Sequence, residues 1–254
     1  MTKREEFLSE IKSNILLPYE TSKIYEEEIV GEFENHLEAE YFVNFCKLLK
    51  GKGIILDLAC GDGRHTLQIS RKANCVVALD LSLNNIKMAK KKCCGRKNIT
   101  FIKGSMLDLP FCESTFDGIW FSQALEYVPP DKREKLLISL NHILKPGGIL
   151  YMSIETWMQP KLLISLKELL GDLLLFYYWK FTKKKPLLWG EFFYCLQARD
   201  IQARYSRWHY HVHTDKWTLL KLLRKLQFKL IKMDLYDGYI YVLCKRIEKE
   251  GGDW

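Results

Sequence analysis

The sequence predicts an α/β fold, with a doubly wound, mostly parallel sheet of seven strands and helices on both faces. One observation behind this prediction is the apolar run at residues 54–58, which leads through a glycine loop into a helical pattern. Another is the further apolar runs at 75–79 and 116–121, which alternate with helical segments. The third is the pair of runs at 228–233 and 239–245, whose short connection predicts antiparallel pairing.

The glycine loop after the first run is the first sign of function. Gly61 and Gly63 allow a ligand to approach the backbone closely, and the amides that start the next helix point toward it. A dinucleotide-binding loop would need a third glycine where this chain has Thr66, and Asp57 would repel a pyrophosphate. The loop therefore predicts a nucleotide-type cofactor that carries a cation, and a larger side chain at Gly63 is expected to enter the ligand's space.

The strand and loop resemble the first motif of class I S-adenosylmethionine-dependent methyltransferases. Four later segments resemble the next motifs of that family in the same order: 76–82, 101–111, 116–121 and 144–151. The resemblance covers about residues 50–155. It implies a Rossmann-like methyltransferase fold, S-adenosyl-L-methionine as cofactor and methylation as the activity, with no metal required.

The resemblance also implies the cofactor-binding residues. Asp80, at the end of the second strand, matches the acid that holds the ribose hydroxyls. Ser105 replaces an acid that bonds adenine in the family, so its hydroxyl, the Met106 amide and Asp108 are alternative contacts. The full expected set is Asp57, Ala59, Cys60, Gly61, Gly63, Asp80, Leu81, Ser105, Met106, Leu107, Ser122 and Gln123.

The acceptor side of the site is expected after the fourth strand. Glu126 is placed to act as a base near the sulfur, although a carboxylate at a helix N-terminus would look the same. His211 lies in a short segment similar to one in tRNA wobble-uridine methyltransferases and several small-molecule methyltransferases. These two are the candidate catalytic residues. The candidate acceptor-binding residues are Tyr25, Tyr127, Trp157, Trp208, His209 and His213.

The three histidines at 209, 211 and 213 alternate along the chain. In an extended segment they share one face, with Tyr210 and Val212 on the other. Three imidazoles suggest a metal site, but no fourth ligand or supporting residue is recognisable in the sequence. Contact with the acceptor, or a polar edge of a lid, is therefore the favoured interpretation, and no metal is expected.

The length and composition fit one decorated domain. The chain of 254 residues is 48% hydrophobic and 28% charged, as in ordinary globular proteins. No signal-peptide pattern is visible, so a cytoplasmic location with reduced cysteines is expected. The expected parts are a helical cap (1–50), a cofactor-binding core (51–156), an inserted lid segment (157–210) and a last helix with two strands (211–254). Within the cap, the first helix is expected to end near Pro18 and the second to begin near Glu32.

Positive charge and aromatic rings gather in the later part of the chain. Residues 158–232 hold 15 Lys and Arg against 5 Asp and Glu, a surplus of 10 within a total of +8. Aromatic rings can stack on RNA bases and guanidinium groups can bind phosphates, so this composition is typical of RNA-binding segments. A hydrophobic lid with snorkelling arginines would have the same composition. The helix predicted at 161–179 has one narrow polar stripe on an otherwise apolar surface. It is interpreted as a lid helix packed on the sheet or a partner, with interfacial membrane contact as the alternative and no transmembrane span.

The sequence therefore favours methyl transfer to a small-molecule acceptor. Methylation of tRNA or another RNA by the basic segment is one alternative. A non-catalytic protein that binds S-adenosylmethionine is another. An NAD-dependent oxidoreductase is disfavoured by Asp57 and Thr66.

Overall fold

The computed structural model describes residues 2–21, 33, 35–50, 53–195 and 208–247. Its helices are α1 (Lys3–Thr21), α3 (His36–Leu48), α4 (Arg64–Ser70), α5 (Leu83–Lys92), α6 (Pro130–Ile143), α7 (Leu162–Tyr177) and α8 (Lys216–Lys225), with short helical turns η1 (Leu125–Tyr127) and η2 (Tyr178–Thr182). Its strands are β1 (Ile54–Leu58), β2 (Cys75–Asp80), β3 (Ile99–Lys103), β4 (Phe116–Ser122), β5 (Leu144–Glu155), β6 (Glu191–Cys195), β7 (Trp208–Val212), β8 (Phe228–Tyr236) and β9 (Tyr239–Arg246).

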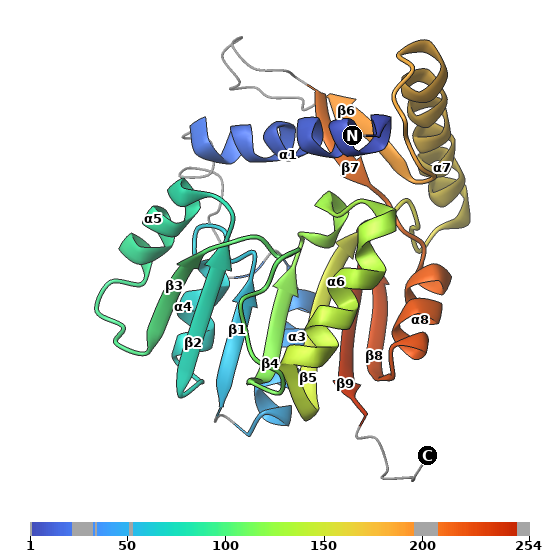
Figure 1. Cartoon of the computed structure of the whole chain (residues 1–254). Coiled ribbons are helices and arrows are strands. Elements are labelled where there is room, and N and C mark those ends of the chain that lie inside the picture. Colours follow the sequence, from blue (N-terminus) through green and yellow to red (C-terminus); the bar gives the residue numbers. More distant parts are fainter. Residues whose placement is uncertain (1, 22–32, 34, 51–52, 196–207, 248–254) are drawn as a thin grey trace, which may run out of the picture.

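Seven strands form one sheet in the order β3-β2-β1-β4-β5-β9-β8 (Figure 1). Strand β1 is parallel to β2 and β4, whereas β9 is antiparallel to β5 and β8. The chain builds β2 and β3 on one side of β1 and then crosses to β4 on the other side. The carboxyl ends of β1 and β4 thus form a topological switch point, where open α/β sheets bind ligands. The predicted fold class, including the antiparallel pair at the end of the chain, is confirmed.

The sheet is buried on both faces. Helices α6 and α8 lie in front of it in Figure 1 and cover a cluster that includes Phe116 and Leu137. On the opposite face, α3 packs Tyr41 against a stacked pair, Trp120 and Tyr151, whose ring centroids are 3.6 Å apart. Burial on both faces explains why the central strands are continuous apolar runs in the sequence.

Helices α1 and α7 and the β6–β7 hairpin form a layer across the carboxyl ends of the parallel strands (Figure 1). Phe7 of α1 packs in one apolar cluster with Trp179 and Tyr210. A buried ion pair adds to this contact, because Arg4 Nη2 lies 2.6 Å from the Oε1 of the fully buried Glu191. The Tyr210 hydroxyl donates to the same carboxylate at 2.6 Å. The first helix is therefore held over the sheet by the inserted segment.

Helix α7 is present as predicted, but it packs on β6 of the hairpin instead of the main sheet. Two residues of its polar stripe, Ser165 and Asp172, point inward, whereas many of its leucines are exposed. The described residues contain no helix long and apolar enough to cross a membrane.

Two helix boundaries in the cap differ from the expectation. Helix α1 continues past Pro18 to Thr21, without the hydrogen bond that a backbone N–H at this position would donate. Helix α3 begins at His36 because the Asn35 side chain accepts hydrogen bonds from the N–H groups of Leu37 and Glu38.

Candidate active site

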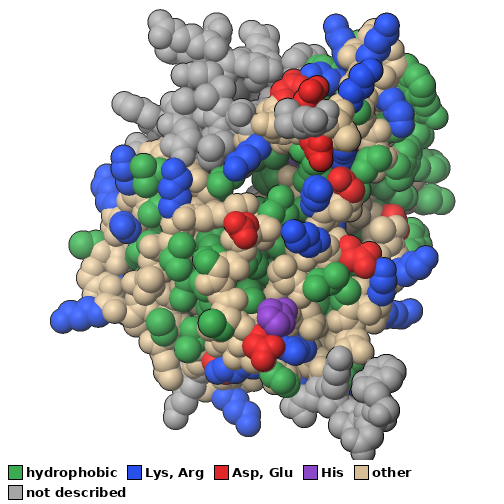
Figure 2. Space-filling model, viewed as in Figure 1, with side chains coloured by type: hydrophobic (Ala, Val, Ile, Leu, Met, Phe, Trp, Pro, Cys, Tyr) green, Lys and Arg blue, Asp and Glu red, His purple; other side chains and the backbone are tan. Residues whose placement is uncertain are grey.

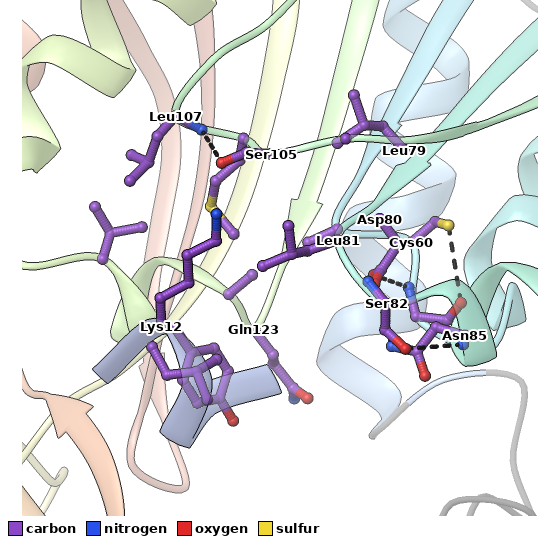
Figure 3. Close-up of a pocket in the computed structure, with 18 of the residues that line it drawn as sticks. Lys12, Cys60, Leu79, Asp80, Leu81, Ser82, Asn85, Ser105, Leu107 and Gln123 are labelled. Carbon is purple, nitrogen blue, oxygen red and sulfur yellow. Dashed lines mark hydrogen bonds between the residues drawn. The ribbon is translucent and has the colours of Figure 1, made fainter. Parts of the chain in front are cut away.

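A cavity of about 580 Å³ lies at the carboxyl ends of β1, β2 and β4, beneath α1 (Figure 3). This volume is in the range of small-molecule sites. Most of the predicted cofactor-binding residues line it: Ala59, Cys60, Gly61, Asp80, Leu81, Ser105, Met106, Leu107, Ser122 and Gln123. Apolar residues of α1 and the segment after η1 line its other part, among them Leu8, Ile11, Ile15, Val128 and Pro129. The cavity thus has a polar end and an apolar end.

Asp80 accepts three hydrogen bonds at the polar end of the cavity. Its Oδ2 accepts the N–H of Gly61 at 2.9 Å, and its Oδ1 accepts the N–H of Ser82 at 2.8 Å and the amide of Asn85 at 3.3 Å. Gly61 has a φ of +53°, and a Cβ added there would meet no atom within 4 Å. These bonds fix the Asp80 carboxylate at the edge of the cavity, beside the glycine loop.

Residues 105–108 form the facing wall, as Figure 3 shows for Ser105 and Leu107. The Ser105 hydroxyl accepts the Leu107 N–H at 3.2 Å, and the Asp108 N–H donates to the Ser105 carbonyl at 3.1 Å. These bonds hold the segment as a tight turn. Both polar alternatives for the adenine contact, Ser105 and Asp108, therefore lie at the cavity.

Gln123, directly after β4, is a strained residue of the cavity wall. Its φ is +50°, which is uncommon for a side chain other than glycine, and its N–H donates to the Ser153 carbonyl at 3.0 Å. Its side-chain Nε2 is buried and has no hydrogen-bond partner in the part of the chain that the structure describes. An unsatisfied buried amide costs free energy, so a ligand oxygen that accepts this N–H would stabilise the site.

Glu38 of α3 is a site residue that the sequence analysis missed. It is fully buried, accepts the Ser122 hydroxyl at 2.7 Å, and lies 3.3 Å from the Nε2 of His65. Arg64 Nη2 lies 4.0 Å from the same carboxylate, and Arg64 and His65 both line the cavity. The sequence did contain a signal for Glu38, because this acid lies among the inward-facing apolar positions of its helix.

Asp57 and Gly63 support the loop but do not line the cavity. Asp57 accepts the Thr66 hydroxyl at 2.5 Å, and burial raises its pKa to about 6 against the opposing effects of His65 and Thr66. A Cβ at Gly63 would lie 2.8 Å from the Ala89 backbone. The expectation that a larger side chain at Gly63 enters the ligand's space was therefore wrong, because it would strike α5.

Comparisons with known proteins agree with this geometry. A family model described as methyltransferase domain matches residues 55–148. An uncharacterized methyltransferase of Synechocystis is 35% identical over 95 residues, which are 37% of this chain and 43% of that protein. A demethylmenaquinone methyltransferase of Staphylococcus aureus is 32% identical over 97 residues, 37% of this chain and 39% of that protein. The chain matches less than half the length of these curated relatives.

Solved structures share the fold over most of the chain. DhpI in complex with S-adenosylhomocysteine has a TM-score of 0.66 and 20% identity, covering 94% of this chain and 98% of DhpI. An S-adenosylmethionine-dependent methyltransferase of Methanosarcina mazei has a TM-score of 0.62 and 22% identity, and the match covers 82% of this chain and 97% of that protein. Residues 55–148 thus match a methyltransferase domain, and the chain has the fold of S-adenosylmethionine-dependent methyltransferases.

The described candidate acceptor residues divide between two places in the structure. Tyr127 lines the main cavity, and its ring meets those of His209 and His211 edge-on, at 5.7 and 5.2 Å between centroids. Trp157 and His213 instead line a second cavity of about 250 Å³ beside α7 and α8.

Two further acceptor candidates are not placed by the structure. Tyr25 lies outside the described residues, as does the side chain of Trp208. Neither of these predictions is tested here.

Glu126 lies on η1 but lines neither of the two described cavities. It is 2% exposed, and its Oε2 has no hydrogen-bond partner among the described residues. Burial, followed by the nearby charge of Glu155, raises its pKa well above the ordinary value. The structure therefore places this candidate base behind the cavity wall, as a carboxyl group that favours the neutral form.

The histidines of the 208–213 segment share one face, as alternation predicts, because Tyr210 and Val212 pack in the cluster with α1 on the other. His211 Nδ1 lies 3.0 Å from the Oε2 of Glu155, and His213 Nε2 lies 3.7 Å from the same atom. The possible ligand atoms of Glu155, His211 and His213 all lie within 4.8 Å of one another, so these residues have the spacing to hold a metal ion.

The carboxylates near this histidine cluster are nevertheless already paired with a histidine, because Glu155 and Asp172 both lie against His213. His213 Nδ1 lies 2.5 Å from the Oδ2 of Asp172. Burial alone would lower the pKa of His213, but the hydrogen bonds with Asp172 and Glu155 raise it to about 9. Burial lowers the pKa of His209 to about 4. At neutral pH the cluster thus contains a cationic His213 between two carboxylates and a neutral His209 behind Tyr127.

Proposed function

We propose that this protein transfers the methyl group of S-adenosyl-L-methionine to a small-molecule acceptor. The observation that carries the proposal is one continuous cavity with a polar end at Gly61 and Asp80 and an apolar end under α1. Donor and acceptor have to share one enclosed space, because the methyl group passes directly between them. The observed cavity offers that arrangement.

The residues present fit the cofactor. Asp80 would accept the ribose hydroxyls, and the wall at 105–108 would contact adenine. The unpaired amide of Gln123 and the guanidinium of Arg64 would meet the amino-acid part, whose carboxylate needs donors. When bound, S-adenosylmethionine supplies a methyl group already activated by the sulfonium.

The chain itself would mainly orient the reactants and exclude water. Leu8, Ile11 and Ile15 of α1 close the apolar end, where Tyr127 offers an aromatic wall and a hydroxyl. Lys12 and Lys132 also line the cavity and give this end a positive charge. An acceptor with an apolar body and a polar or anionic group matches these contacts.

The comparisons support a small acceptor. The name of the Staphylococcus aureus relative refers to demethylmenaquinone, and a Burkholderia thailandensis methyltransferase with a TM-score of 0.58 and 15% identity was solved with 1,6-didemethyltoxoflavin. Lys183, Lys184 and Lys185 belong to the basic segment on which the RNA alternative rests, but they do not line either described cavity, and Lys185 pairs with Glu10.

The test has two stages. Calorimetry with S-adenosylhomocysteine on the wild type and on Asp80→Ala measures cofactor binding, and mass spectrometry identifies any copurified ligand. A radiolabelled methyl donor is then screened against metabolite and tRNA fractions. Label in a small molecule supports the proposal, whereas label confined to RNA, or cofactor binding with no transfer to either fraction, contradicts it.

A further inference from the structure

The outward face of α7 and η2 carries a row of large apolar side chains, three or four positions apart. The α7 stripe, as we name it, consists of Leu163, Leu166, Leu170, Leu174, Tyr177 and Phe181. Its members are strongly exposed, for example Leu163 at 82%, Leu174 at 64% and Phe181 at 63%. Figure 2 shows hydrophobic side chains gathered along the edge where α7 lies. A contiguous exposed patch of this kind marks an interaction surface.

The helix cannot turn this stripe inward, because its inner face is fixed by specific bonds. Ser165 is buried and its hydroxyl donates to the Gln159 carbonyl at 2.9 Å. About two turns further along α7, Asp172 is hydrogen-bonded to His213. In η2, the indole N–H of Trp179 donates to the Phe193 carbonyl at 2.9 Å. Rotation of α7 would break all three contacts. The apolar side is therefore the side available to a partner.

Charge near the stripe identifies the partner's chemistry. Lys167 lies beside the stripe, Lys161 precedes it, and Lys183 and Lys184 follow it, all of them exposed. In the described segment 161–185, Glu168 is the exposed carboxylate, because Asp172 faces inward. None of Lys161, Lys167 and Lys184 has a carboxylate within ion-pair distance among the described residues. An apolar row flanked by lysines matches an anionic lipid surface.

We propose that the α7 stripe docks flat on an anionic lipid bilayer, with its leucines among the acyl chains and the flanking lysines at the phosphates. Lysine stems reach headgroups readily from such a position. A second copy of this chain fits less well, because two stripes brought together by symmetry would also bring their lysines together without acids to pair them. The inference does not rest on the proposed methyl transfer, so its test needs no acceptor.

The experiment is cosedimentation of the full chain with vesicles of phosphatidylcholine alone or mixed with phosphatidylglycerol. The wild type should bind the anionic vesicles more strongly. The triple change Leu163→Gln, Leu166→Gln and Leu170→Gln should lower the partition coefficient about a hundredfold, because three apolar side chains lose their burial. The triple change Lys167→Gln, Lys183→Gln and Lys184→Gln should lower it about tenfold or more, and only on anionic vesicles.

A matched control removes exposed apolar side chains elsewhere. The pair Ile138→Gln and Ile231→Gln, at positions 49% and 44% exposed, should leave vesicle binding unchanged. Circular dichroism and the thermal midpoint show that each variant is folded. Wild type that does not sediment with anionic vesicles, or leucine variants that sediment undiminished, would overturn the proposal. So would analytical ultracentrifugation showing a lipid-free dimer that the leucine changes dissociate.

Discussion

The N–H of Gly61 donates to the Oδ2 of Asp80 at 2.9 Å, which joins the loops that follow β1 and β2. One carboxylate thus shapes the glycine loop and lies at the cavity where we propose that the ribose binds. Replacing Asp80 with Ala should weaken binding of S-adenosylhomocysteine by about 2–4 kcal/mol, through lost charge-assisted hydrogen bonds. Calorimetry measures this change, with Glu113→Ala, an exposed acid that lines neither described cavity, as the control that should leave the affinity unchanged. Unchanged affinity in a folded Asp80→Ala protein would contradict the assignment.

The two loop glycines should respond differently to substitution. Gly63→Val should lower the free energy of unfolding by about 3 kcal/mol or more, because the new side chain would clash with the Ala89 backbone. Gly61→Ala should cost only about 1–2 kcal/mol of stability, for its left-handed backbone, but should impair cofactor binding at the cavity. Thermal unfolding and calorimetry on both variants separate the two effects. Equal loss of stability at both positions would show that the packing argument is wrong.

The buried pair Arg4 and Glu191 should hold α1 over the cavity. Arg4→Ala leaves the carboxylate of Glu191 buried without its cation, which should cost about 2–4 kcal/mol. Hydrogen exchange in α1 should accelerate as the helix loosens. The control is Lys185→Ala, which removes the more exposed pair with Glu10 and should cost less than about 1 kcal/mol. Similar protection of α1 in wild type and Arg4→Ala would argue against this role.

Stability should fall at alkaline pH through His213. Its pKa in the folded protein, about 9, lies above the ordinary 6.5 because of Asp172 and Glu155, although burial acts the other way. A raised histidine pKa stabilises the fold fully below about pH 6.5 and loses that contribution as pH rises through 9. Thermal midpoints of wild type and His213→Gln should therefore differ most at about pH 6 and converge above pH 9. A gap that is constant across this range would contradict the ion-pair interpretation.

Metal removal should leave the protein intact. Glu155, His211 and His213 have the spacing of a ligand set, but Asp172 and Glu155 already pair with His213. We expect purified protein to contain no stoichiometric transition metal, and EDTA to leave the thermal midpoint unchanged. Metal analysis by mass spectrometry and thermal unfolding provide the measurement. Stoichiometric zinc, with a lowered midpoint after chelation that zinc restores, would show that the histidine cluster is a metal site.

Local sequence patterns were sufficient for the core of the fold. The apolar runs, the glycine loop and the acid at Asp80 depend on neighbours within a few positions, since a strand, a turn and a helix start are each decided by short-range sterics and burial. The resemblance to class I methyltransferases supplied twelve cofactor candidates, of which all except Asp57 and Gly63 line one cavity.

What only the tertiary structure decided are relationships between distant segments. Glu38 of α3 bonds to Ser122 of the cavity wall because α3 packs across the sheet, whereas Glu126 of η1 lies outside the cavity lining, near the charges of Glu155 and Arg133. The face that α7 turns to solvent is another such case. Periodicity reveals that a helix has an apolar and a polar side, but which side is buried depends on the partners available. Here His213 pairs with Asp172 and Gln159 with Ser165, so this side of α7 faces the protein, and Leu163, Leu166, Leu170 and Leu174 face outward.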